Sequence, residues 1–206
     1  MPSPRFKLVV ALMSVLTVGT YLAEPYVGAR SFDELRVAPT FTLGTLNGST
    51  FSMARVDGAP AVLVAAANGT TANLSARPGG TAVLIDFMAT WCPPCREEIR
   101  QLALVRSVYP PSRLQILTVD VDYSETPQEL KDWLHAYSAF NETHEDRGWY
   151  FAMDTRGEFV GPRYGANALP TLVLVDGEGR VRRTWVGTVT AADLEVAIDA
   201  ALTAVG

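Results

Sequence analysis

The only two cysteines of the chain, Cys92 and Cys95, are three positions apart within the run Trp91–Cys95, which reads WCPPC. Two thiols at this spacing can form a reversible disulfide or supply two ligands to a metal ion. A zinc ribbon needs a second cysteine pair, which the chain lacks, and its two histidines, His135 and His144, are distant in sequence from the cysteines. We therefore expect a redox couple at this position, and neither a metal site nor a cofactor.

The residues on either side of the cysteine pair predict a strand that turns into a helix. Residues 81–88 form an apolar run interrupted by Asp86, and residues 93–108 carry apolar side chains at helical spacing, namely Ile99, Leu102, Val105 and Val108. Cys92 then lies at the helix N-terminus, where unpaired N–H groups and the positive end of the helix dipole favour a thiolate. Because only a thiolate attacks a disulfide, we expect Cys92 to be the nucleophile and Cys95 the resolving thiol.

Two carboxyl groups are placed to accept the proton that Cys95 must lose. Asp86 lies six residues before Cys92 in an otherwise apolar strand, where burial of a carboxylate is costly, and a working acid–base group explains it better than a structural accident. Glu98 follows Cys95 by one helical turn. At that position a surface glutamate with no role in chemistry is an equally good interpretation.

The rest of the chain predicts an α/β fold with a central mixed sheet and helices on both faces, because strand and helix patterns alternate from residue 81 onward. Before residue 81, apolar runs separated by Asn-Gly and Pro-Gly turns predict an extra N-terminal β-hairpin region. We expect one folded domain over residues 38–206, with strands at 40–46, 50–53, 61–67, 81–88, 114–121, 149–153, 171–176 and 181–186, and helices at 93–108, 127–140 and 191–204.

The N-terminal residues predict a membrane-targeting segment. Residues 8–23 carry no charge and follow Arg5 and Lys7. We expect a single-pass signal-anchor helix within residues 1–24 and a tether over 25–37, although the run is slightly shorter than the roughly 20 residues of a typical span. The alternative is a signal peptide cleaved after Ala29, which gives a secreted protein. Because the positive charges precede the apolar run, both interpretations place the folded domain outside the cytoplasm, where a cysteine pair can persist as a disulfide.

The charge distribution argues against nucleic acid as a partner. The 17 lysines and arginines are scattered among 22 aspartates and glutamates, for a net charge of -5. Phosphate binding requires clustered basic side chains, and the sequence has no such cluster.

Three motifs resemble the TlpA-like branch of the thioredoxin superfamily: residues 85–98 (IDFMATWCPPCREE), residues 164–176 (YGANALPTLVLVD) and residues 179–181 (GRV). This branch includes membrane-anchored thiol reductases of cytochrome c maturation. The resemblance implies a thioredoxin-like fold over about residues 38–204, with Cys92 as the exposed nucleophile and Cys95 as the resolving cysteine.

The resemblance also implies the partners and the substrate surface. Pro170 matches the cis-proline of a loop that faces the cysteines and offers backbone groups to an extended substrate segment. The implied partners are a protein disulfide substrate and a membrane electron donor that recharges the cysteines. We expect the substrate to contact five residues, Trp91, Pro93, Pro94, Leu169 and Pro170.

These observations favour a thiol–disulfide oxidoreductase that reduces protein disulfides outside the cytoplasm through a mixed disulfide. Two alternatives stay open. A non-catalytic binding or chaperone module would use the same fold without needing Cys92. A copper carrier would bind Cu(I) through the two thiolates, although the sequence has no methionine or histidine at close spacing to complete the site.

Overall fold

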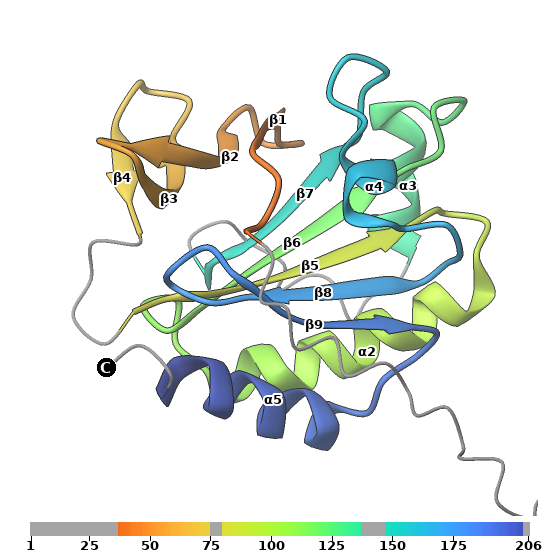
Figure 1. The fold of residues 1–206 in the computed structure, drawn as a ribbon. Helices are drawn as coiled ribbons and strands as arrows, with labels where there is room; N and C mark the ends of the chain where they lie inside the picture. Colours follow the sequence, from red (N-terminus) through yellow and green to blue (C-terminus); the bar gives the residue numbers. More distant parts are fainter. Residues whose placement is uncertain (1–36, 75–79, 137–146, 204–206) are drawn as a thin grey trace, which may run out of the picture. The chain divides into compact units, whose positions relative to one another are not determined.

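The computed structural model describes residues 37–74, 80–136 and 147–203, and the strands of these residues form two sheets (Figure 1). The predicted membrane segment and nearly all of the predicted tether lie outside the described residues. None of the helices in the described ranges is long and apolar enough to cross a membrane. The described fold begins at Val37, which forms a β-bridge with Arg180.

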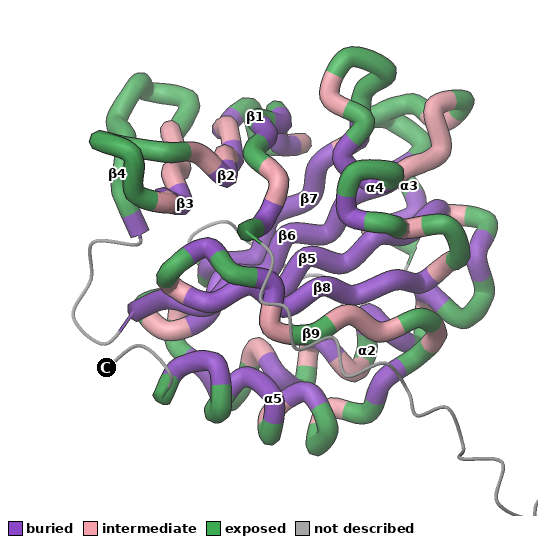
Figure 2. Tube along the Cα trace, in the orientation of Figure 1, coloured by how far each residue is buried: buried purple, intermediate pink, exposed green. Residues whose placement is uncertain are grey.

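A mixed sheet of five strands carries the cysteine loop. In spatial order its strands are β7 (Trp149–Met153), β6 (Leu114–Asp120), β5 (Ala82–Met88), β8 (Thr171–Val175) and β9 (Val181–Val186). The neighbours β7, β6 and β5 are parallel, whereas β8 is antiparallel to both β5 and β9. Every residue of β5, β6 and β8 is buried (Figure 2), as expected for apolar strands that are covered on both faces.

Both faces of this sheet are covered. The helices are α2 (Pro93–Val108), α3 (Pro127–Ala136), α4 (Val160–Tyr164) and α5 (Ala191–Thr203). Alternate residues of a strand point to opposite faces, so Leu84 of β5 packs in a cluster with Ile99 of α2 and Ile198 of α5. The alternate residues of β5 face the other way. On that face, the ring centroid of Phe87 lies 5.7 Å from that of Tyr164 of α4. The predicted mixed sheet with helices on both faces is confirmed.

The N-terminal β region is an antiparallel meander of four strands, β1 (Phe41–Gly44), β2 (Thr50–Val56), β3 (Ala59–Ala65) and β4 (Thr71–Asn73). Asn-Gly turns follow β1 and β3, and in them Gly48 and Gly69 adopt φ values of +83° and +84°, a conformation that glycine accepts without strain. The aromatic ring of Phe51 packs against that of Tyr150 of β7, with centroids 5.2 Å apart. This region is therefore held by the same core as the central sheet.

Three local predictions differ from the structure. The sequence analysis missed β4 and α4, because β4 has three exposed residues and α4 has five residues that include Gly161 and Pro162. Val108 was expected on the buried face of α2, but it is 56% exposed. Tyr109, the residue after the helix, is buried in its place, and its hydroxyl donates a hydrogen bond to Asp199 Oδ1 at 2.8 Å.

Candidate active site

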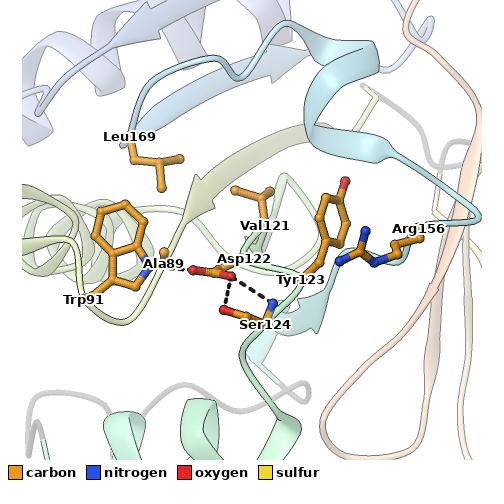
Figure 3. Close-up of a pocket in the computed structure, with 8 residues that line it drawn as sticks. All are labelled: Ala89, Trp91, Val121, Asp122, Tyr123, Ser124, Arg156 and Leu169. Atoms are coloured by element: carbon orange, nitrogen blue, oxygen red, sulfur yellow. Dashed lines mark hydrogen bonds between the residues drawn. The ribbon is translucent and has the colours of Figure 1, made fainter.

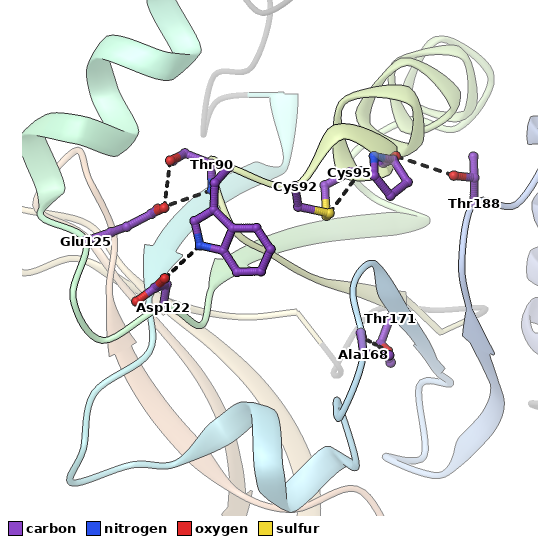
Figure 4. Close-up of a disulfide and its surroundings, with 10 residues drawn as sticks. Thr90, Cys92, Cys95, Asp122, Glu125, Ala168, Thr171 and Thr188 are labelled. Carbon is purple, nitrogen blue, oxygen red and sulfur yellow. Dashed lines mark hydrogen bonds between the residues drawn. A yellow bond between two sulfur atoms is a disulfide. The ribbon is translucent and has the colours of Figure 1, made fainter.

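Cys92 and Cys95 are joined by a disulfide at the start of α2 (Figure 4). Cys92 is the N-cap residue, and its Sγ accepts a hydrogen bond from the backbone N–H of Cys95 at 3.3 Å. Pro93 and Pro94 occupy the next two positions, where the missing N–H groups leave no helical hydrogen bond unmade. The loop therefore places Cys92 at the positive end of the helix dipole.

The exposure of Cys92 differs from the expectation. The resemblance implied an exposed nucleophile, whereas Cys92 is 2% exposed and Cys95 is fully buried in the disulfide form. The physical reason is that the Sγ of Cys92 is bonded to Cys95, on the inner side of the helix terminus, within the buried cluster of α2.

Asp86 lies on the helix-covered face of the sheet, because it alternates with Leu84 and Met88 of the cluster that contains Cys95. It is fully buried. Its Oδ2 accepts a hydrogen bond of 3.1 Å from the hydroxyl of Thr118 on β6, whereas among the described residues its Oδ1 has no hydrogen-bond partner. Burial raises the pKa of Asp86 well above its ordinary value, the charge of Glu98 raises it further, and the Thr118 hydrogen bond lowers it.

Glu98 is fully buried, so the interpretation as a surface glutamate is wrong. Its Oε2 accepts a hydrogen bond of 2.7 Å from the N–H of Val189, and its Oε1 has no partner within the described residues. Burial raises the pKa of Glu98 from 4.5 to about 7, against the opposing effect of the Val189 hydrogen bond. At neutral pH this carboxyl group can therefore both accept and donate a proton.

The loop before β8 is the second element of the site. The Leu169–Pro170 peptide bond is cis. Pro170 is buried and Leu169 is half-buried. The hydroxyl of Thr171 donates a hydrogen bond of 2.6 Å to the carbonyl of Ala168, which holds the turn in place (Figure 4).

A group of acidic side chains at the end of β6 and just after it holds the residues that precede Cys92. Glu125 accepts two hydrogen bonds from Thr90. The backbone N–H of Thr90 donates to Oε2 at 3.2 Å, and the hydroxyl of Thr90 donates to Oε1 at 2.7 Å. The indole N–H of Trp91 donates to Asp122 Oδ2 at 2.7 Å (Figure 3). Asp120 is buried next to this group. Burial, together with the nearby carboxyl of Glu125, raises the pKa of Asp120 to about 8.

The sequence analysis missed these three acidic residues. A signal was present, since Asp120 ends the parallel strand next to β5 and Asp122 follows that strand. Side chains at the carboxyl ends of neighbouring parallel strands meet at one edge of a sheet. In the described part of the chain, no three histidine, cysteine, aspartate or glutamate side chains are grouped so that they could hold a metal ion.

A pocket of about 340 Å³ adjoins the cysteine loop and the loop before β8 (Figure 3). Trp91, the residue before Cys92, and Leu169, the residue before Pro170, both line it. Of the substrate-contacting residues expected from the sequence, the structure thus brings Trp91 and Leu169 together at one cavity.

A dithiol that begins a helix on such a sheet, with a cis-proline loop beside it, defines the chain as a thioredoxin-fold redox protein. The comparisons with known proteins agree. The model of the Redoxin family matches residues 36–199, and the chain belongs to this family.

Individual relatives place the chain near the branch that the sequence resembled. It is 25% identical over 191 residues to thiol-disulfide oxidoreductase ResA of Bacillus cereus (strain ATCC 10987 / NRS 248), covering 92% of this chain and 91% of that protein. It is 26% identical over 113 residues to sporulation thiol-disulfide oxidoreductase A of Bacillus subtilis (strain 168), covering 54% of this chain and 63% of that protein.

A solved structure gives the same result. The crystal structure of the Chlorobium tepidum protein assigned as thiol:disulfide interchange protein DsbE superposes with a TM-score of 0.58 at 26% identity, over 84% of this chain and 99% of that one. The resemblance to TlpA-like members of the thioredoxin superfamily is confirmed, and the chain is an oxidoreductase of this class.

Proposed function

We propose that this protein reduces disulfides of other proteins outside the cytoplasm, with Cys92 and Cys95 as the working dithiol. The observation that carries the proposal is the disulfide at the N-terminus of α2 together with two buried carboxyl groups, Asp86 of β5 and Glu98 of α2. Each carboxyl group keeps one oxygen that has no hydrogen-bond partner among the described residues. A proton can therefore be accepted there without breaking an existing contact.

The first step is attack on the substrate. In the reduced protein, the helix N-terminus and the N–H of Cys95 favour a thiolate on Cys92. This thiolate attacks one sulfur of the substrate disulfide, the bond between the two substrate sulfurs breaks, and one sulfur leaves as a thiolate. A mixed disulfide then links Cys92 to the substrate.

The second step is resolution by Cys95. The thiol of Cys95 gives its proton to Asp86 or Glu98, and the resulting thiolate attacks the Sγ of Cys92. The mixed disulfide breaks, the second substrate sulfur leaves as a thiolate, and the Cys92–Cys95 disulfide forms. In total, two electrons pass from the dithiol to the substrate disulfide.

The proposed reducing direction of electron flow rests on the resemblance to thiol reductases, and the loop sequence supports it. No histidine or lysine lies between the two cysteines, so beyond the helix N-terminus the loop itself supplies no positive charge to a Cys92 thiolate. A dithiol donor in the membrane would then return the disulfide to the reduced form. The expected result of a redox titration is a reducing couple, and a potential near the roughly -120 mV of strong oxidants would reverse the assignment.

The proposed location outside the cytoplasm is supported by the uncharged run of residues 8–23 behind Arg5 and Lys7. A reporter that is active only outside the cytoplasm, fused after residue 206, should be active. A reporter that is active only inside the cytoplasm should be silent, and the opposite pattern would contradict the proposal.

The activity is tested by reduction of insulin with dithiothreitol as the electron source. The wild-type protein should accelerate insulin reduction, and Cys92→Ser should abolish the acceleration, because attack needs the thiolate of that residue. A protein that acts only as a binding module or chaperone would keep its effect in Cys92→Ser, and that outcome would refute the proposed function.

A further inference from the structure

The pocket beside the disulfide has two chemically different ends (Figure 3). Its volume of about 340 Å³ lies at the lower end of the range for ligand pockets. A pocket of this size suits one or two side chains of a polypeptide better than a large cofactor. Eight residues line it: Ala89, Trp91, Val121, Asp122, Tyr123, Ser124, Arg156 and Leu169.

The end next to Cys92 is apolar. The indole of Trp91 is 62% exposed, yet its N–H is fixed by the 2.7 Å hydrogen bond to Asp122. The side chains of Leu169 and Val121 face it across the pocket (Figure 3). An exposed aromatic ring that is held in one position is a typical anchor for an apolar partner group.

The far end carries a cation. The guanidinium carbon of Arg156 lies 5.4 Å from the centroid of the Tyr123 ring. Its guanidinium forms no ion pair with a carboxylate within the described ranges. Planar N–H donors of this kind match a carboxylate in a bidentate geometry.

The acidic side chain in the pocket is already engaged. Both oxygens of Asp122 accept hydrogen bonds, Oδ2 from Trp91 and Oδ1 from the N–H and the hydroxyl of Ser124 at 2.8 and 2.6 Å. Asp122 is thus occupied in holding the pocket wall, which leaves Arg156 as the charged group of the pocket available to an incoming ligand.

We propose that this pocket selects the polypeptide that flanks the reactive cysteine of the substrate. The residue next to that cysteine places an apolar side chain against Trp91 and Leu169, and an acidic side chain slightly further along the same polypeptide pairs with Arg156. The inference rests on the proposed function, because the pocket acts only on a substrate that is attacked by Cys92. It assigns Arg156 and Leu169 to specificity and leaves the thiol chemistry to the cysteines.

The test uses disulfide-linked peptide dimers and the pre-reduced protein in single turnover, with release of peptide thiol as the readout. The three peptides are Cys-Phe-Gly-Glu, Cys-Phe-Gly-Lys and Cys-Gly-Gly-Glu, each with blocked termini. The first peptide should react about fivefold faster than the second, as expected for one exposed ion pair worth about 1 kcal/mol. It should also react faster than the third, which lacks the apolar side chain.

Substitutions at Arg156 locate the effect. Arg156→Ala should remove the preference for glutamate over lysine, and Arg156→Glu should invert it. The matched control is Arg163→Ala, which removes an exposed arginine of α4 that pairs with Glu158 and does not line the pocket. This variant should keep the wild-type preference.

Two failures can be told apart. Equal rates for the three peptides, or an unchanged preference in Arg156→Glu, would overturn the inference about the pocket. Bis(2-hydroxyethyl) disulfide is uncharged and too small to span the pocket, so it reports on the thiol chemistry of the wild-type protein alone. If the reduced wild-type protein reacts neither with it nor with any peptide, the proposed function itself is wrong.

Discussion

Two groups of carboxyl side chains flank the cysteine loop, and they differ in which residues they contact. The inner pair, Asp86 and Glu98, lies between β5 and α2, and each member has one oxygen without a hydrogen-bond partner among the described residues. The outer group consists of Asp120, the last residue of β6, and of Asp122 and Glu125, which follow that strand. Asp120 also has one oxygen, Oδ2, without a hydrogen-bond partner among the described residues. Asp122 and Glu125 direct their oxygens at the loop and accept hydrogen bonds from Trp91 and Thr90.

A raised pKa does not separate the two groups. Burial raises the pKa of Glu98 to about 7 and that of Asp120 to about 8, yet the two residues have different surroundings. Glu98 lies on the buried face of α2 with Cys95, whereas Asp120 accepts a hydrogen bond from the N–H of Asp122, one of the residues that position the loop. We therefore assign proton transfer to the inner pair and positioning of Thr90 and Trp91 to the outer group.

The largest effect is expected from Asp86→Asn. Loss of a general base should slow resolution of the mixed disulfide by about 100-fold, whereas the initial attack by Cys92 should keep its rate, because that step does not use the proton of Cys95. Rapid-quench single-turnover experiments separate the two rates.

The matched control for that substitution is Asp176→Asn, which alters a buried aspartate at the end of β8 that pairs with Arg182 at 2.9 Å. It should leave the ratio of the two rates at the wild-type value. Equal slowing of attack and resolution in Asp86→Asn would contradict the assigned role.

The pH dependence of stability tests Glu98. Because its pKa is raised from 4.5 to about 7 in the folded state, the folded protein holds this proton more tightly than the unfolded chain. The free energy of unfolding should therefore fall as the pH rises from about 4.5 to about 7. Glu98→Gln should remove roughly 2 to 4 kcal/mol of that fall, measured by denaturant unfolding of the disulfide form at several pH values.

Glu97→Gln is the control, since Glu97 is exposed and the hydrogen bonds from Gln101 and Arg100 lower its pKa. Its stability should follow the wild-type pH dependence over that range. Parallel curves for Glu98→Gln and the wild type would show that Glu98 does not titrate in this range.

Glu125→Ala tests the outer group. It removes both acceptors of Thr90, so the protein should lose about 1 to 3 kcal/mol of stability. Attack and resolution should slow in the same proportion, because both depend on the position of the loop. Slowing of resolution alone would move Glu125 into the proton-transfer path and break the distinction between the two groups.

Asp122→Ala is expected to have the smallest effect. The lost hydrogen bond to the exposed Trp91 is worth about 0.5 to 1.5 kcal/mol, and the indole should become more mobile, which the anisotropy of tryptophan fluorescence reports. The other tryptophans are the same in the wild type and in Asp122→Ala, so a difference in anisotropy reports on Trp91. Unchanged anisotropy would show that Asp122 does not hold the ring.

The elements that carry the cysteines could be predicted from the sequence because their signals are local. Helix α2 covers the predicted residues 93–108, since prolines mark its start and apolar residues recur at helical spacing. Helix α4 has no such signal. It begins at Val160, after Phe159 in a left-handed conformation with φ of 48°.

The surroundings of the cysteines could be predicted only in part. Asp86 was identified because a single carboxylate interrupts an apolar strand. The burial of Glu98 depends on Val189, which lies 91 residues away in the sequence, and the outer group depends on a contact between Thr90 and Glu125 across 35 residues. Such contacts arise from the order of strands in the sheet, which local patterns do not contain.

The division of roles between Cys92 and Cys95 is tested most directly by trapping the mixed disulfide. Cys95→Ala and Cys92→Ala are each reduced and incubated with a disulfide substrate, and intact-mass spectrometry measures the fraction of protein that carries an adduct. Cys95→Ala should accumulate a stable adduct on Cys92, and Cys92→Ala should carry little or none, because Cys95 lies inside α2 and lacks the N-cap position that favours a thiolate on Cys92. Equal adducts on both variants, or an adduct on Cys95 alone, would contradict the account.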